Sequence, residues 1–343
     1  MSELDQALPR FQRGCLEYGQ DSSNHGPMAA EALEILGHGA LIPALTDVYT
    51  PRLGVFALGQ AIEPDAMEAA LGNGEDGHWV ATFLDRIETS SWSATVQEWL
   101  PRLLPGMFAA SGQALLRTAH ALRAVRRLET RPRILEVAYG LGYWASRFQT
   151  LPGGPASHPV TGFGAVQWLE SLTPLLSSRD PGSGFEWTES AAAIDLQSDE
   201  IDAQISSLCA FGASLYLGNA QDRAMAARCV TLPSALRLLS DELDSADLRQ
   251  AIGFVTQALA AVWLNSSNPA PRFEGDLQDD EVLRLSEEEP EIRYVAACSA
   301  EGNAIMLAEA CLREDRLRSD RHLRFAAADA ALRIGVSAGS RGA

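Results

Sequence analysis

Residues 111–123 constrain the fold of this chain more than any other segment. Their sequence, SGQALLRTAHALR, has the spacing of an α-helix whose apolar members are mostly Ala and Leu. Gln113, Arg117 and His120 fall at i, i+4 and i+7, so an amide, a guanidinium and an imidazole share one helix face. Such groups are seldom buried unless they are paired or used. This face is therefore predicted to meet other polar groups inside a helical protein.

The composition is that of an ordinary globular protein. The chain has 343 residues, of which 46% are hydrophobic, and can form one large domain or two smaller ones. No run of about 18 apolar residues occurs, so no membrane span is expected, and the first residues lack the pattern of a signal peptide. The cysteines are scattered without a C-x-x-C pair, which favours a cytoplasmic location and argues against disulfides or a thiolate zinc site. They are Cys15, Cys209, Cys229, Cys298 and Cys311.

The charge of the chain excludes two classes of function. The net charge is -18, and binding to nucleic acid phosphates needs a basic surface, so nucleic acid is not expected as a partner. The 27 basic residues are all arginine, because the sequence contains no lysine. Schiff-base catalysis, lysine general bases and lysine carbamates are therefore excluded.

Helical patterns cover most of the chain, and no long alternating pattern typical of strands is present. Pro27 and Gly37 bracket one predicted helix, with Asn24 placed to cap it. Thr231 and Pro233 suggest a break between two helices. Further helices are expected at about residues 38–50, 64–72, 79–88, 92–104, 106–127, 133–149, 163–177, 188–195, 198–208, 219–229, 232–241, 245–265, 278–286, 291–312 and 320–334.

These patterns predict an all-α fold. We expect one compact domain over residues 1–343, built from two helical halves around a central cavity. The halves comprise about residues 1–150 and 160–335, and the Pro/Gly/Ser-rich stretch at about 152–160 is the loop between them.

Generic catalytic motifs are absent from the sequence, so the histidines are the candidates for acid–base work. Gly140 and Gly142 lie inside a helical pattern, which favours close helix packing over a nucleotide-binding loop. His25 directly precedes one predicted helix, and His38 opens the next segment. Together with His120 they make a shared pocket a hypothesis.

Five segments, taken in order, resemble motifs of the questin oxidase-like family. They are NHGPM at 24–28 with ALEILG at 32–37 and YTPRL at 49–53, LPG at 104–106 with GQALLRTAHA at 112–121, EVAYGLGYWA at 136–145, VTLPSALR at 230–237, and NAIMLAEACLRE at 303–314. They span nearly the whole chain. The resemblance implies an all-α fold and a role in tailoring aromatic polyketides such as anthraquinones, by Baeyer–Villiger-type oxidation or oxidative ring cleavage.

The resemblance also implies a ligand set that this chain has largely lost. In family members that act as iron-dependent oxygenases, four histidines and a carboxylated lysine hold the metal. Only His25 keeps its histidine here, while Gln113, Arg228 and Asn303 stand at the other histidine positions and Met306 at the lysine position. Amides and a thioether are poor ligands for iron, and an arginine repels a cation. No metal and no cofactor are therefore expected.

The polar side chains that stand at these positions suggest acid–base chemistry on a polycyclic or polyketide-like small molecule. The candidate reactions are cyclisation, isomerisation, dehydration and cofactor-free oxygenation. His25 or His120 is the candidate proton shuttle, and Arg117 or Arg228 is the candidate anion stabiliser. For the tyrosines, core packing is an equal interpretation. The expected substrate-binding residues are Gln113, Arg117, Asn303, Met306, Tyr139 and Tyr143.

Two alternatives stay open at this point. One is a non-catalytic binder that sequesters a hydrophobic intermediate in the same pocket. The other is a metal-dependent oxygenase, as in the family, with a rearranged site of His25, His38 and His120. A homodimer is also left open, whereas a membrane partner is not expected.

Overall fold

The structure is a computed structural model that describes residues 1–19, 22–153, 164–172, 200–265 and 277–335. Across these residues it is helical almost throughout, and the two short strands found there, β1 (Glu17–Tyr18) and β2 (Ser22–Ser23), form one antiparallel pair. The all-α prediction is confirmed. The predicted helix at 188–195 lies outside the described residues.

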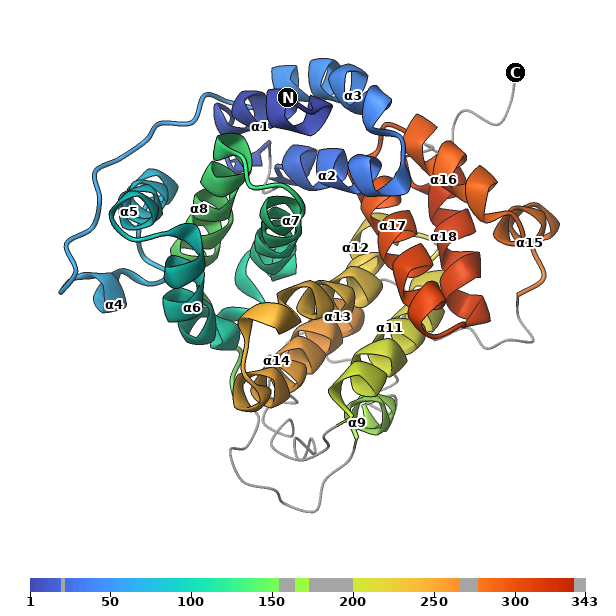
Figure 1. The fold of residues 1–343 in the computed structure, drawn as a ribbon. Helices are drawn as coiled ribbons and strands as arrows, with labels where there is room; N and C mark the ends of the chain where they lie inside the picture. The colour runs from blue at the N-terminus through green and yellow to red at the C-terminus, as the bar shows by residue number, and fades with distance from the viewer. Residues whose placement is uncertain (20–21, 154–163, 173–199, 266–276, 336–343) are drawn as a thin grey trace.

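The first half of the chain forms a bundle in which α8 packs against α1, α5, α6 and α7 (Figure 1). Four short 3₁₀ turns connect these helices: η1 (Gly39–Leu41), η2 (Thr50–Arg52), η3 (Leu104–Gly106) and η4 (Ala109–Gly112). The helices are α1 (Glu3–Gln12), α2 (Gly26–Leu36), α3 (Ile42–Tyr49), α4 (Met67–Ala70), α5 (Asp76–Thr89), α6 (Trp92–Leu103), α7 (Gln113–Arg127) and α8 (Arg131–Ser146).

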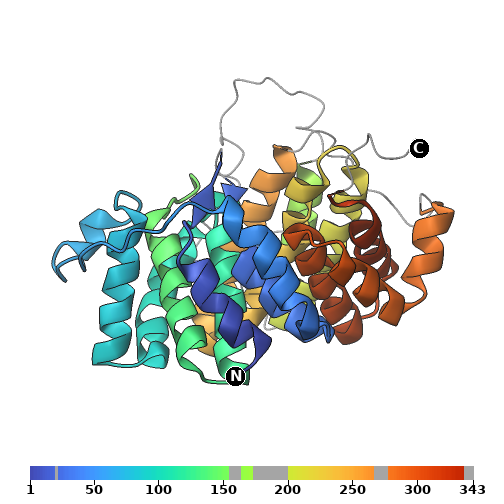
Figure 2. The same cartoon turned by 90° about the horizontal axis from the view of Figure 1, so that it is seen from above.

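The second half packs around α11, α13 and α18. Its elements are α9 (Ala165–Ser171), α11 (Ile201–Gly218), α12 (Arg223–Ala226), α13 (Arg228–Leu239), η6 (Ser240–Glu242), α14 (Ser245–Leu264), α15 (Asp280–Ser286), α16 (Glu289–Cys298), α17 (Gly302–Leu317) and α18 (Arg321–Arg333). Seen from above, these helices lie beside the first bundle (Figure 2).

The two halves share a core. α2 packs on both α7 and α17, and α7 packs on α13. The buried apolar side chains form one continuous cluster that runs from α1 to α18. Four helices drawn from both halves, α2, α7, α13 and α17, therefore meet at the centre of the molecule (Figure 1).

Several predicted helix boundaries are wrong, among them the end of the helix predicted at 198–208, which continues as α11 to Gly218. Pro233 does not break a helix but lies inside α13. Proline has no backbone N–H to donate to the Cys229 carbonyl, and this carbonyl lies against Gly212 of α11. The helix predicted at 106–127 begins only at Gln113, since the residues just before it have left-handed backbone. Ala300, with φ of 55°, divides the helix predicted at 291–312 into α16 and α17.

The start of α2 also differs from its prediction. The helix contains Pro27 in its first turn and ends at Gly37 as expected, but its N-cap residue is His25 rather than Asn24. The Asn24 side chain instead accepts from the Gly26 backbone at 3.1 Å and donates to the Cys15 carbonyl at 3.2 Å. Asn24 therefore fixes the loop that delivers His25.

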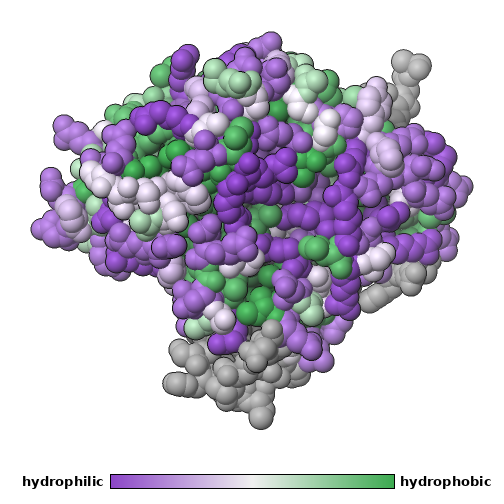
Figure 3. Space-filling model, in the orientation of Figure 1, coloured by the Kyte–Doolittle hydropathy of each residue, from purple (hydrophilic) through white to green (hydrophobic). Residues whose placement is uncertain are grey.

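Polar residues cover most of the face in Figure 3, and apolar residues appear there in small groups. Among the helices described, none combines the length and the apolar character that crossing a membrane would require.

Candidate functional site

Four helices begin side by side at the centre of the protein. His25 is the N-cap residue of α2, while Gln113, Arg228 and Gly302 are the first residues of α7, α13 and α17. In none of these four helices does the side chain of the N-cap residue accept a hydrogen bond from the first turn. The start of a helix carries a partial positive charge. The arrangement therefore concentrates positive potential where the four helices meet.

His25, Gln113 and Arg228 form a hydrogen-bonded chain, called here the His25 cluster. The Gln113 side chain is buried and donates its amide N–H to His25 Nε2 at 3.1 Å. Its amide oxygen accepts from Arg228 Nε at 2.8 Å and Nη2 at 3.2 Å. The opposite amide orientation would set a nitrogen donor against two guanidinium donors. The amide thus holds the imidazole and the guanidinium at a fixed separation.

The first turn of α17 lies directly against His25. A Cβ added at Gly302 would come 2.9 Å from His25 Cβ, so glycine is needed for this approach. Asn303 follows at once, and adjacent Cα atoms are about 3.8 Å apart, which places its backbone beside His25 as well. Asn303 is half-buried and Met306 is buried. Both predicted substrate-binding residues therefore lie on the helix that covers the His25 cluster.

The charge of Arg228 is not balanced by any carboxylate within ion-pair distance in the part of the chain that the structure describes. Apart from Gln113, the guanidinium contacts Met225, with Nη1 3.1 Å from Sδ. Burial lowers the pKa of Arg228, but an arginine stays protonated in proteins. A half-buried cation thus sits where the first residues of these helices meet.

His25 is neutral in this setting. Burial, and then the charge of Arg228, lower the pKa of its imidazole to about 4. Because Gln113 donates to Nε2, the single proton of the neutral ring is placed on Nδ1. The His25 backbone N–H donates to Tyr49 Oη at 2.8 Å, which fixes the residue at the start of α2.

The two tyrosines predicted as substrate contacts differ in their surroundings. The buried Tyr143 hydroxyl donates to Glu17 Oε1 at 2.8 Å and lies 2.8 Å from Ser23 Oγ. Burial raises the pKa of Tyr143, and its phenol is close enough to Arg228 for an electrostatic interaction. Tyr139 is half-buried and packs on Phe56 with ring centroids 5.4 Å apart. Of the two predicted substrate contacts, Tyr143 is the one near the cluster.

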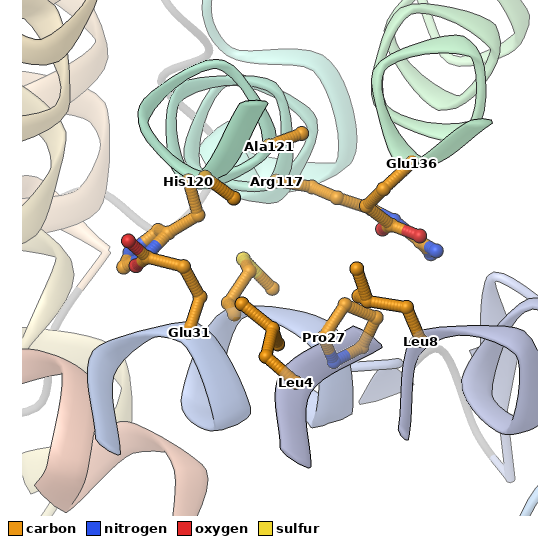
Figure 4. Close-up of a pocket in the computed structure, with 10 residues that line it drawn as sticks. Leu4, Leu8, Pro27, Glu31, Arg117, His120, Ala121 and Glu136 are labelled. Carbon is orange, nitrogen blue, oxygen red and sulfur yellow. The ribbon is translucent and has the colours of Figure 1, made fainter. Parts of the chain in front are cut away.

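The other two polar residues on the predicted face of α7 pair with different carboxylates. Arg117 Nε donates to Glu136 Oε1 at 2.8 Å, and His120 Nδ1 lies 2.7 Å from Glu31 Oε2. Both side chains are buried beside a cavity of about 10 Å³ between α1, α2 and α7, lined mainly by apolar carbon (Figure 4). Such a volume holds at most one water molecule. His120 also lies about 10 Å along the helix axis from Gln113.

A second polar layer lies below the His25 cluster, and we call it the Arg123 network. Arg123 bridges Glu31 at 2.6 Å and Glu309 at 2.6 Å. Arg313 lies 3.3 Å from Glu309 and donates to Ser234 Oγ at 2.6 Å. With His120 on Glu31, the network links α2, α7, α13 and α17. Its members are Glu31, His120, Arg123, Ser234, Glu309 and Arg313.

The residues at the His25 cluster do not fit a transition metal. The imidazole nitrogen that would bind a metal already accepts a hydrogen bond from Gln113. The oxygen of the same amide accepts from the positively charged Arg228 guanidinium. Among the described residues, no three His, Cys, Asp or Glu side chains come together as a metal site requires. His38 lies elsewhere, against Tyr294, with ring centroids 6.1 Å apart.

Sequence reasoning missed Tyr49 and Ser23, which fix the loop around His25. For Ser23, the adjacent Asn24 and His25 were the available signal. No protein-family model matches the chain, and no curated protein matches its sequence. The resemblance to the questin oxidase-like family therefore stays a prediction.

Proposed function

We propose that this protein is a metal-independent acid–base enzyme acting on a hydroxylated polycyclic, polyketide-like small molecule. One observation carries the proposal: the Arg228 cation, without a carboxylate partner among the described residues, is hydrogen-bonded through Gln113 to a neutral imidazole. A cation beside a neutral base is the pair that ionises a phenol or an enol. The five resembling motifs supply the polycyclic substrate class.

The proposed step is a proton transfer. A substrate hydroxyl displaces the Gln113 amide from His25 Nε2; its O–H bond breaks and an N–H bond forms on the ring. The oxyanion that remains is stabilised by Arg228 and by the partial positive charge at the starts of the surrounding helices. The imidazolium later returns the proton to carbon or oxygen. Cyclisation, isomerisation or cofactor-free oxygenation of the ionised substrate would follow from this first step.

A hydroxylated anthraquinone such as emodin is a direct probe, because ionisation moves its visible absorption to longer wavelength. We expect the bound dye to absorb as the phenolate in a buffer about one pH unit below the pKa of the free dye. Arg228→Met should bind dye that stays neutral. Arg318→Met is the matched control, since Arg318 is exposed and contacts Ser207 on the surface. Dye that stays neutral on the native protein would overturn the proposal.

One observation favours a binding-only role instead. The Gln113 amide already occupies the His25 lone pair, so a ligand that cannot displace it would be held without reaction. Product formation separates the two functions. With a substrate that turns over, His25→Gln should lower kcat by about 10²–10⁴ and leave binding largely intact. A bound ligand that no variant and no native protein converts would support the binder.

A further inference from the structure

The backbone just before Gln113 is strained. Ala110 has φ and ψ of 50° and 42°, and Ser111 has 54° and 37°, so two consecutive non-glycine residues adopt the left-handed conformation. Gly112 follows with φ of 86°. Side chains disfavour this region because Cβ approaches the neighbouring carbonyl oxygen. Strain of this kind persists where the surrounding structure imposes it, and it is enriched at functional sites.

Contacts on both sides explain what imposes it. The Gly112 N–H donates to the Phe108 carbonyl at 3.2 Å, and the Gln113 N–H donates to the Ala110 carbonyl. A Cβ on Gly112 would overlap the side chain of Leu232, so the turn rests directly on α13. Leu232 lies four residues after Arg228 and therefore on the same helix face. The turn thus sets the first residue of α7 against the residue of α13 that Gln113 binds.

We propose that the left-handed turn 110–112 is the positioning element of the site, which holds Gln113 between His25 and Arg228. The inference rests on the proposed function for its catalytic meaning. Without the turn, α7 would start earlier, as its sequence predicts, and its first residue would point elsewhere. With it, the amide reaches both partners, and the tautomer of His25 and the direction of the Arg228 guanidinium are set together.

Substitutions at the half-buried Ser111 test the turn, because residues differ in their tolerance of left-handed backbone. Ser111→Gly and Ser111→Asn permit this conformation, Ser111→Ala tolerates it less, and Ser111→Val opposes it. The first readout needs no ligand. Imidazole ¹H–¹⁵N correlations in protein labelled at histidine report which ring nitrogen of His25 carries the proton, with His25→Gln assigning the signal.

We expect Ser111→Gly and Ser111→Asn to keep the Nδ1–H tautomer of native His25, and Ser111→Val to show a mixture of both tautomers. Gln113→Asn, whose shorter amide cannot reach both partners, should reproduce the Ser111→Val result on an unchanged backbone. The phenolate-to-phenol ratio of bound emodin should fall about tenfold in both Ser111→Val and Gln113→Asn, equivalent to one pKa unit. Circular dichroism checks that each variant is folded.

An unchanged tautomer in a folded Ser111→Val protein, or an equal loss in Ser111→Gly, would overturn the proposal. If Ser111→Val does not fold, Ser111→Ala set against Ser111→Gly decides the same question on a smaller scale. Emodin that stays neutral on the native protein would overturn the proposed function alone, because the tautomer measurement is made without it. The two failures are therefore distinguishable.

Discussion

Helices α2, α7, α13 and α17 meet twice, at their first residues in the His25 cluster and about two turns further along in the Arg123 network. In the network, two buried carboxylates, Glu31 and Glu309, share Arg123 and have His120 and Arg313 beside them. In the His25 cluster, the one formal charge is that of Arg228, and its hydrogen-bond partners there are neutral.

The two layers differ in whether their charged groups satisfy one another. Charged groups that satisfy one another inside a protein fix how helices pack, and they have little capacity left for a ligand. A half-buried cation held by a neutral amide keeps part of its charge available. The same four helices thus carry a layer that holds them together and a layer that, in the proposed function, binds an anionic oxygen.

The largest effect that would sharpen this comparison comes from removing one arginine in each layer. Arg123→Met leaves two buried carboxylates without their shared cation, and breaking a buried pair typically costs about 3–5 kcal/mol. Arg228→Met removes a cation that has no carboxylate partner among the described residues. We expect its free energy of unfolding in urea to stay within about 1 kcal/mol of native, or to rise. Equal losses in both variants would contradict the assignment of the two layers.

Acidification should weaken the His25 cluster before the Arg123 network. The pKa of His25 is lowered from 6.5 to about 4, so the unfolded chain binds a proton that the folded protein refuses between these values. The free energy of unfolding therefore falls as pH drops from about 6.5 to 4, by up to about 3 kcal/mol at 1.36 kcal/mol per pKa unit. Urea titrations at several pH values measure it, and His25→Gln should flatten this window.

The titration of Glu31 sets the pH range in which the Arg123 network loses stability. Arg123 and His120, acting against burial, lower the pKa of Glu31 to about 2. A carboxylate with a lowered pKa contributes stability that is present above its unfolded value and is lost as pH falls from about 4.5 to 2. His25→Gln should leave that lower window unchanged. A variant that is flattened in both windows would show that the two layers are coupled rather than separate.

The sequence predicted most helices because their local signals are strong, as Pro27 and Gly37 show for α2. The sequence-based prediction failed where a helix depends on contacts with residues that are distant in the sequence. Pro233 lies inside α13, whose Cys229 carbonyl lies against Gly212 of α11, and no local pattern reveals that contact. One local signal was overlooked: the capping box of Ser2 and Asp5, which starts α1.

The candidate site shows the same limit. Helical spacing correctly put Gln113, Arg117 and His120 on one face, and all three are buried. It could not tell that their partners stand on three different helices and divide them among separate sites. Glu31 and Glu136 carry no local sign of this role, because a buried ion pair depends on the approach of two helices and not on spacing within either one.

A smaller effect tests His120, the second candidate proton shuttle. His120→Gln weakens a buried hydrogen bond to the Glu31 carboxylate, and bonds to charged groups contribute about 1.5–3 kcal/mol. We expect a loss of about 2 kcal/mol in urea unfolding and no change in the phenolate signal of bound emodin. Loss of that signal with full stability would instead place His120 in the reactive layer.

The smallest expected effect concerns Tyr143. The sequence allowed two interpretations of this residue, substrate contact and core packing. Its hydroxyl is committed to Glu17 and Ser23, so Tyr143→Phe should cost about 1 kcal/mol in the free energy of unfolding. If the ring is a wall of the substrate site, Phe preserves it and emodin affinity stays within about threefold of native, while Tyr143→Leu weakens binding by roughly 1 kcal/mol through lost ring contacts. Equal affinity in Phe and Leu variants would show that Tyr143 only packs the core. Ser23→Ala is the matched control, because it removes one of the two hydrogen bonds of the Tyr143 hydroxyl and leaves the ring in place.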